Sequence, residues 1–167
     1  DIKEYSTKKG HIIGICGGLQ MLGISLEDPF FKEGSKSCLE KKIKGIGLLP
    51  IRTTFFQNKL TRQISSESLW PCLSKINGFE IHNGQTELDN TQNLLKIKPI
   101  FKDLNLGWYK ETKEGGTVAG TYMHGIFEND NWRDQYINLI RESKNLPIFN
   151  KKSISYKKKR ESIIDNL

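Results

Sequence analysis

The stretch Gly14-Ile15-Cys16-Gly17-Gly18 decides the fold of this 167-residue chain. The mostly apolar run His11-Ile12-Ile13 precedes it, and leucines at helical spacing follow over residues 19–26. A glycine two residues before and two residues after the cysteine is the spacing of a nucleophile elbow, in which a strand turns sharply into a helix. Glycine avoids backbone collisions in such a turn and permits positive φ. The pattern therefore predicts a strand–elbow–helix unit with Cys16 at the turn.

A cysteine at this turn has a chemical use. The N-terminus of the following helix favours the thiolate, which is the form of cysteine that attacks. The backbone N–H of Gly17 is placed to donate to an oxyanion. Two plainer readings stay open: a cysteine after a strand is often a small buried hydrophobe, and the glycines can form an ordinary tight turn. We predict a nucleophilic Cys16.

A second segment, residues 118–127, reads as a buried strand that ends in His124 and a loop. A neutral imidazole at a strand end can serve as base for a thiol and later as acid for a leaving group. Such a pair is usually far apart in sequence. A lone histidine is more often structural, but this chain also carries an elbow. We therefore predict that Cys16 and His124 act together.

Four segments of the chain resemble the class I, or triad-type, glutamine amidotransferases, and they come in the family's order. Residues 14–23 resemble the nucleophile segment, and residues 120–127 resemble the histidine segment of the family's cobyric acid synthase branch. Residues 45–55 resemble the strand after the elbow helix, and residues 78–86 resemble the branch's Gly-Tyr-Glu-Ile-His-x-Gly-x-Thr segment. The resemblance implies an α/β, flavodoxin-like fold with a central sheet and a nucleophile elbow.

The resemblance also implies roles for further residues. Gln20 and Gly18 would hold the substrate glutamine; the alternative for Gln20 is a helix residue that faces solvent. Glu80 and His82 alternate along a strand and so share one face, which suits a hydrogen-bond network near the site. The alternative for Glu80 and His82 is a polar pair at the surface.

The chain departs from the family pattern in two respects. Ile126 stands where many members carry a glutamate that orients the catalytic histidine, so Glu80 is a candidate orienting group and Glu128 a weaker one. The elbow strand also lies only about ten residues after Asp1, where the family's first strands and second oxyanion donor would come earlier. We expect residues 1–150 to form a partial amidotransferase domain and residues 151–167 a basic C-terminal tail.

The activity implied by the resemblance is hydrolysis of glutamine to supply ammonia. In the cobyric acid synthase branch, a synthetase domain on the same chain uses ATP and Mg to amidate a corrinoid, adenosylcobyrinic acid a,c-diamide, in cobalamin biosynthesis. One alternative keeps the glutaminase and changes the acceptor, as in cobyrinic acid a,c-diamide synthase or a cell-wall lipid amidotransferase. A second alternative is a non-catalytic module that only docks to a synthetase.

Composition narrows the function classes further. No apolar run approaches the ~18 residues of a membrane span, and the hydrophobic content is 36%. The net charge of +7 is concentrated in residues 151–167, with six basic and two acidic residues, but no groove-reading motif or aromatic platform accompanies them. The three cysteines fit neither a disulfide framework nor zinc spacing. We expect a cytoplasmic protein with no nucleic-acid or membrane partner, no metal, and no cofactor in this domain.

Periodicity predicts an α/β chain with a mixed or parallel central sheet. The expected strands are 11–15, 48–56, 78–82 and 117–123, with one or two short strands within 94–109. The expected helices are 17–26 and a second one that begins at Asn129 or Asp130 and ends at Leu146-Pro147. We expect residues 30–44 to form a loop and residues 57–75 to be irregular.

Overall fold

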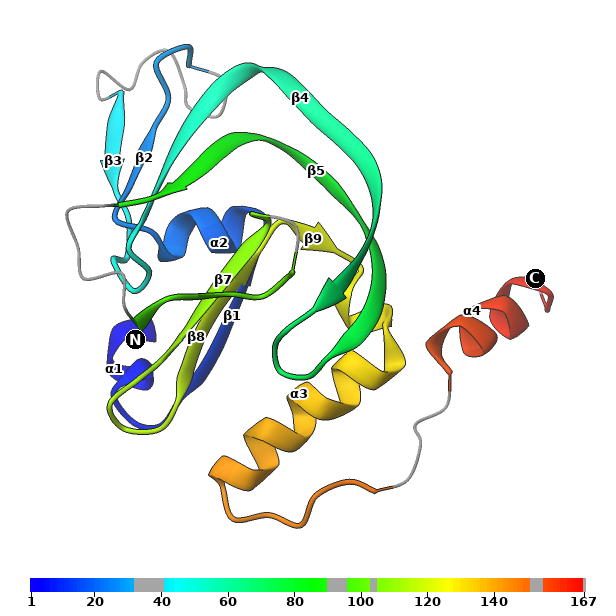
Figure 1. Ribbon diagram of the computed structural model, residues 1–167. Coiled ribbons are helices and arrows are strands. Elements are labelled where there is room, and N and C mark those ends of the chain that lie inside the picture. Colours follow the sequence, from blue (N-terminus) through cyan, green and yellow to red (C-terminus); the bar gives the residue numbers. More distant parts are fainter. Residues whose placement is uncertain (32–40, 90–95, 103–104, 151–154, 167) are drawn as a thin grey trace.

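The computed structural model describes residues 1–31, 41–89, 96–102, 105–150 and 155–166. It is a mixed α/β fold with two sheets (Figure 1). The helices are α1 (Ile2–Ser6), α2 (Gly17–Leu22), α3 (Asp130–Ser143) and α4 (Tyr156–Ile164). The strands are β1 (His11–Ile15), β2 (Ser25–Glu27), β3 (Lys42–Lys44), β4 (Ile51–Ser68), β5 (Ser74–Leu88), β6 (Lys98–Pro99), β7 (Gly107–Glu111), β8 (Thr117–Thr121) and β9 (Met123–His124).

The first sheet, in the order β1-β8-β7-β6, positions the elbow. Strand β1 runs parallel to β8, so that Ile15 is opposite Thr121 and both strands end at the same edge. Every residue of β8 is buried, and α2 packs directly on it, because a Cβ at Gly120 would lie 2.4 Å from the Leu19 side chain. This close approach of helix and sheet fixes where the chain turns after β1.

The second sheet, in the order β3-β2-β4-β5-β9, is dominated by the long antiparallel pair of β4 and β5. Figure 1 shows this pair as one curved ribbon that arches over α2 and reaches α3 with its far end. The pairing register shifts between Phe55 and Leu60. The middle of β5 also pairs with β9, with Phe79 opposite His124 and Glu80 opposite Met123. The ribbon therefore connects the two sheets next to the elbow.

An aromatic cluster joins the ribbon to α3. Trp132, fully buried, donates its indole N–H to the Trp70 carbonyl at 2.9 Å and stacks on Tyr136. Trp70 stacks on Tyr109 of the first sheet with ring centroids 4.8 Å apart. The three tryptophans of the chain, including Trp108, are core residues, and such rings contribute much of the buried apolar area of a small domain.

The α/β class and the strand–elbow–helix unit are confirmed, but two predicted segments are wrong. The elbow helix ends at Leu22 and not at residue 26, because Gly23 continues in extended backbone and Ser25–Glu27 joins the second sheet as β2. Residues 57–68 are strand and not irregular. This part of β4 lies on a ribbon whose side chains are exposed from Phe56 to Gln63, so it has no apolar alternation.

Other predicted boundaries also change. The strand expected over 78–82 extends over Ser74–Leu88, and the strand expected over 48–56 begins at Ile51. Within the predicted loop 30–44, Lys42–Lys44 forms the short edge strand β3, and residues 32–40 lie outside the described part of the chain. The strands expected within 94–109 correspond to β6 and to the start of β7.

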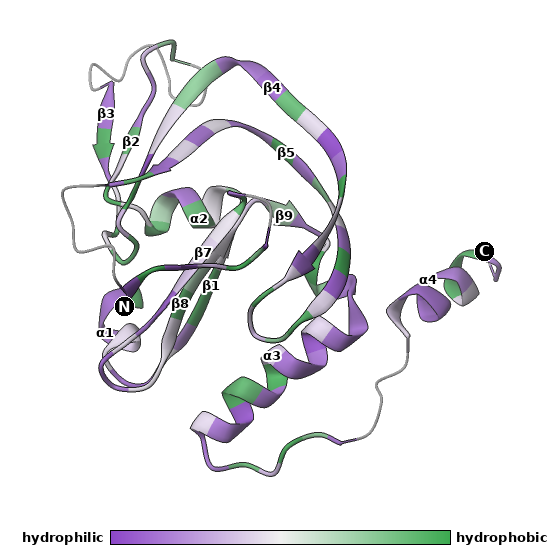
Figure 2. Ribbon diagram, viewed as in Figure 1, coloured by the Kyte–Doolittle hydropathy of each residue, from purple (hydrophilic) through white to green (hydrophobic). Residues whose placement is uncertain are grey.

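The basic C-terminal segment contains a helix, α4, with no buried residue. Figure 2 shows α4 as mostly hydrophilic and set apart from the rest of the fold. It contacts the start of α3 and the residues just before it: Arg160 forms an ion pair with Glu128 at 3.3 Å, and the Tyr156 N–H donates to the Asp130 carboxylate at 3.0 Å. Among the described residues, no helix has the length and apolar character to cross a membrane.

Candidate active site

Cys16 adopts the strained backbone of an elbow. Its φ is 54° and its ψ is −110°, a region that residues other than glycine rarely enter. Its N–H donates to the Thr121 carbonyl at 2.8 Å, and its own carbonyl accepts from the Gln20 N–H at 3.2 Å to begin α2. Strain of this kind persists where the surrounding structure fixes it, and it concentrates at functional sites. The predicted elbow geometry is therefore present, with Cys16 half-buried at the turn.

The glycines before and after Cys16 differ in the space around them. A Cβ at Gly14 would lie 2.5 Å from the backbone of Gly18, which is the collision that the sequence predicted. At Gly17 and Gly18 a Cβ would meet no described atom within 4 Å. The predicted positive φ is found at Cys16 itself, not at these glycines. Gly17 and Gly18 thus leave open space beside the first turn of α2.

Strand β5 brings Cys16 and His124 to the same short segment. The Cys16 sulfur lies 3.5 Å from the Ile81 carbonyl oxygen. The His124 ring stacks on Phe79, with centroids 5.0 Å apart and planes at 12°. Phe79 and Ile81 are two residues apart on one strand, about 6.8 Å along it, so both predicted partners lie beside the same short segment of β5. The His124 Nε2 is buried, with no hydrogen-bond partner among the described residues.

Gln20 lies one helical turn after Cys16, on the same face of α2. It is buried, which excludes the alternative of a residue facing solvent. Its amide nitrogen donates to the Tyr122 hydroxyl at 3.1 Å. A Cβ at Gly84 would lie 2.7 Å from that nitrogen, so the glycine of β5 makes room for the Gln20 amide.

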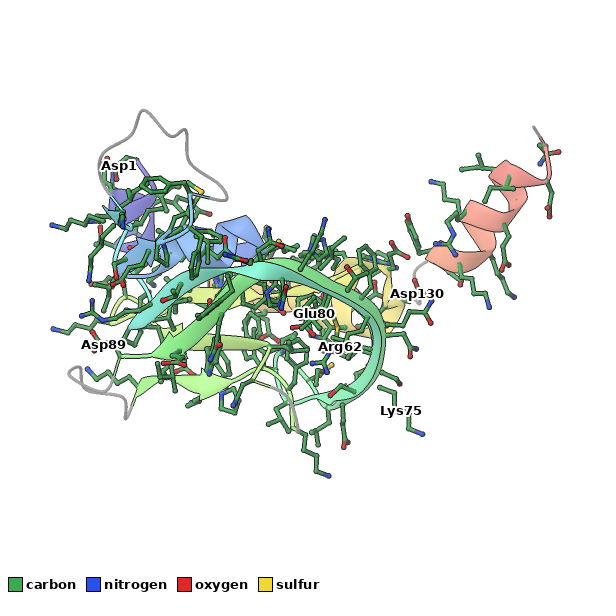
Figure 3. The ribbon with its side chains drawn as sticks, turned by 90° about the horizontal axis from the view of Figure 1, so that it is seen from above. Asp1, Arg62, Lys75, Glu80, Asp89 and Asp130 are labelled. Atoms are coloured by element: carbon green, nitrogen blue, oxygen red, sulfur yellow. The ribbon has the colours of Figure 1, made fainter. Side chains whose placement is uncertain are left out.

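Glu80 and His82 share one face of β5, as the alternation predicted, and Glu80 Oε1 lies 2.6 Å from His82 Nε2. The other oxygen of Glu80 accepts from Arg62 Nε at 2.6 Å. Figure 3 shows Arg62 and Glu80 beside each other inside the curve of the ribbon. The carboxylate is therefore occupied by Arg62 and His82, so Glu80 does not orient His124 as expected. The reason is geometric: Glu80 is opposite Met123, while His124 is opposite Phe79.

Glu128 was the weaker candidate for orienting His124. Its carboxylate forms an ion pair with Arg160, and its carboxyl carbon would lie 3.6 Å from a Cβ on Gly125. Glu128 is thus near the residue that follows His124, but its ion pair is with α4.

A cavity of about 520 Å³ opens beside the Glu80–His82 pair. Most of the residues that line it are of polar types, and they come from β4, β5 and the residues before β7 and β9. They include Arg62, His82, Asn83, Gly84 and Tyr122. Burial is the main cause that raises the pKa of the Tyr122 phenol, while hydrogen bonds with Thr86 and Gln20 act in the opposite direction. No group of three or more His, Cys, Asp or Glu side chains within the described ranges is arranged to hold a metal ion.

Sequence reasoning missed two members of this network. Arg62 belongs to the segment that was expected to be irregular, so nothing indicated that it would be opposite Glu80 in the ribbon. Tyr122 lies inside the histidine segment, but the sequence pattern predicts no role for it. Tyr122 lies in the bend between β8 and β9, so strand alternation gives no signal for its position.

Cys16 at a strand–helix elbow and His124 on β9 both lie beside β5, the arrangement expected of a thiol-dependent amidotransferase. Residues 1–132 match the family model of the CobB/CobQ-like glutamine amidotransferase domain, and the chain belongs to this family. Cobyric acid synthase of Prochlorococcus marinus strain AS9601 is 87% identical over the whole chain, and that of strain MIT 9312 is 80% identical. Cobyric acid synthase of strain NATL2A is 46% identical over 99% of the chain. In each case the chain spans 33% of the relative's length.

Proposed function

We propose that this chain is the glutamine-hydrolysing part of a cobyric acid synthase. The observation that carries the proposal is the positive-φ Cys16 between β1 and α2. Cys16 contacts Ile81 of β5, and His124 stacks on Phe79 of the same strand. The family match supports glutamine as substrate, and the relatives named cobyric acid synthase support the particular enzyme.

The first half of the reaction is attack by Cys16. Its thiolate sulfur forms a bond to the carboxamide carbon of glutamine, and the carbonyl oxygen becomes an oxyanion. The first N–H groups of a helix have no intrahelical acceptor, so the Gly17 N–H is available to donate to that oxygen. The substrate lies in the open space beside Gly17 and Gly18, with Gln20 one turn further along α2. Glycine at both positions lets the carboxamide approach the backbone.

The second half needs a proton donor and then a base, and His124 supplies both. When the carbon–nitrogen bond breaks, His124 gives its proton to the leaving nitrogen, ammonia departs, and a γ-glutamyl thioester remains on Cys16. His124 then takes a proton from water, whose oxygen attacks the thioester carbon and releases glutamate and the thiolate. An imidazole nitrogen without a protein partner suits this role, because it can bond to substrate and water in turn.

The proposal extends to the partners of this domain. The relatives are about three times as long as the chain, and we place on the same chain a synthetase domain that uses ATP and Mg. Ammonia would react there with activated carboxylates of the corrinoid adenosylcobyrinic acid a,c-diamide. A cytoplasmic location is part of this proposal, as is the division into an amidotransferase domain over residues 1–150 and a basic segment over residues 151–167.

Two alternative functions differ from this proposal in the acceptor that is amidated or in whether glutamine is hydrolysed. A cobyrinic acid a,c-diamide synthase or a cell-wall lipid amidotransferase would keep the same glutaminase and amidate another acceptor. A docking module would hydrolyse no glutamine. The strained Cys16 disfavours the docking module, because a module without chemistry has no use for a residue held in that backbone conformation.

The test uses the full-length protein with Cys16→Ala and His124→Ala, and Cys72→Ala as the matched control. We expect both site variants to lose glutamine-dependent amidation and to retain amidation with ammonium salt, while the control keeps both activities. Loss of ammonia-dependent amidation in a folded Cys16→Ala protein would show that Cys16 acts outside glutamine hydrolysis. Amidation of a different acceptor would leave the glutaminase assignment intact and replace the corrinoid.

A further inference from the structure

A buried carboxylate lies between two cationic partners outside the Cys16–His124 pair. The Glu80 side chain is only 3% exposed, and its two oxygens lie 2.6 Å from Arg62 Nε and 2.6 Å from His82 Nε2. The His82 side chain is 10% exposed, and its other ring nitrogen, Nδ1, lies 2.6 Å from the Gly84 carbonyl oxygen. Distances this short are typical of charge-assisted hydrogen bonds.

The hydrogen bonds determine where the protons of His82 lie. A carbonyl oxygen can only accept, so Nδ1 carries a proton and donates it to Gly84. Nε2 faces Glu80, whose ionised form also only accepts. Arg62 always carries its charge and can only donate, so the Glu80 oxygen that faces it accepts the hydrogen bond from Nε. Nε2 therefore carries the second proton, and His82 is an imidazolium held between Glu80 and the Gly84 carbonyl.

His82 in turn contacts the group that holds Gln20. Its ring stacks on Tyr122 with centroids 3.7 Å apart and planes at 20°, an arrangement in which a cationic ring attracts the aromatic face. The Tyr122 hydroxyl lies 2.6 Å from Thr86 Oγ1 and accepts from the Gln20 amide. A continuous set of contacts thus runs from Arg62, through Glu80, His82 and Tyr122, to a residue one turn after Cys16.

We propose that Arg62 and Glu80 are positioning residues for glutamine binding, which keep His82 doubly protonated and thereby fix Tyr122 and the Gln20 amide. The proposal rests on the proposed function, since Gln20 is taken to contact the substrate. The contacts of Arg62, Glu80 and His82 lead through Tyr122 to the Gln20 amide, so these residues act through Gln20 on glutamine binding. Besides His82, the charged side chains lining the adjacent cavity are Arg62, Glu80 and Glu87. Of these, Glu80 contacts both Arg62 and His82.

Glu80→Gln in the full-length protein is the main test, because it keeps the shape and removes the charge. Arg62 requires an acceptor, so the carboxamide oxygen turns toward Arg62 and the NH₂ group faces His82 Nε2. That nitrogen must then accept, and His82 becomes neutral. Nitrogen-15 NMR of histidine-labelled protein at pH 7 reports this directly: we expect two protonated ring nitrogens in the wild type and one in the variant, with the His82 signal assigned by His82→Gln.

Kinetics of the same variant test the positioning role. We expect the KM for glutamine to rise about three- to tenfold, the size of a lost hydrogen bond, with kcat changed less than twofold. Ammonia-dependent amidation and the alkylation rate of Cys16 should not change. Glu67→Gln is the matched control, because Glu67 is an exposed carboxylate of the same ribbon that pairs with Lys102. Arg62→Gln is the second variant and should raise the KM in the same direction, since the half-exposed Arg62 can be replaced without leaving a cavity.

Each outcome bears on a separate claim. A neutral His82 in the wild type overturns the protonation assignment, whether or not the protein hydrolyses glutamine. An unchanged KM in folded Glu80→Gln and Arg62→Gln proteins overturns the positioning role. A wild-type protein that binds no glutamine overturns the proposed function instead, and the NMR experiment still decides the state of His82.

Discussion

Replacing Gly14 and Gly18 by alanine, one at a time, separates two reasons for glycine in the elbow. At Gly14 the new Cβ would lie 2.5 Å from the carbonyl carbon and oxygen of Gly18 and 2.7 Å from the Leu19 nitrogen. All three atoms are backbone, so no side-chain rotation relieves the contact. Overpacking of this kind costs about 1–3 kcal/mol, and a purely backbone contact belongs near the upper end. We expect Gly14→Ala to lower the melting temperature by about 6–12 °C.

Gly18→Ala should instead stabilise the folded protein. No described atom lies within 4 Å of the new Cβ, the position has no positive φ, and it lies within α2, where alanine is favoured over glycine by up to about 1 kcal/mol. We expect the melting temperature to rise by about 2–4 °C. If glutamine occupies that space, the added methyl group displaces it, and the KM for glutamine rises at least about tenfold.

Calorimetry on both variants of the full-length protein measures the melting temperatures, and glutamate-release kinetics measure the KM for glutamine. The reasoning on packing fails if Gly14→Ala is as stable as the wild type or if Gly18→Ala melts at a lower temperature. The placement of the substrate fails if a stable Gly18→Ala protein keeps the wild-type KM. A variant that is stabilised and impaired at the same time is the result that the geometry predicts.

Iodoacetamide at pH 8 should modify Cys16 before Cys72, because burial raises the pKa of the Cys72 thiol and the thiolate is the reactive form. Peptide mass spectrometry measures the order of modification, and earlier modification of Cys72 would contradict the assignment of Cys16 as the nucleophile. Burial also raises the pKa of Tyr136 to about 12. The pKa of tyrosine in the unfolded chain is about 10, so folding favours the neutral phenol of Tyr136. Its contribution to the free energy of unfolding is complete below pH ~10 and is lost as pH rises toward ~12. Urea unfolding between pH 8 and 11.5 should show the loss, and Tyr136→Phe should lack that component. Trp132→Phe should cost about 2 kcal/mol, because it leaves the Trp70 carbonyl without its buried donor; equal stability in urea would refute this.

The elbow could be predicted from the sequence because its determinants are local. Gly14, Cys16 and the strand before them lie within a few residues, and the collision that requires Gly14 involves Gly18, four residues away. The pairing of Glu80 with His82 could be predicted for the same reason, since strand alternation places residues two apart on one face.

The middle of the ribbon could not be predicted because this part of β4 has no buried residue. Residues 56–63 are all exposed, so they show no alternation, and their strand conformation depends on pairing with β5. Arg62 reaches Glu80 only through that pairing. The early end of α2 likewise depends on β2 pairing with both β3 and β4, contacts that the leucine spacing does not reveal.

The β4–β5 ribbon also has a consequence for how the site is lost. Cys16, His124 and His82 all depend on residues 79–82 of β5, yet the strand that pairs with this segment is exposed on both faces around Arg62. Segments with few buried apolar contacts open at lower free energy than the core. Amide hydrogen exchange around Arg62 and Glu80 should therefore be faster than in the fully buried strand β8. Glutaminase activity would accordingly disappear on heating through sub-global opening of the ribbon, before the tryptophan core unfolds.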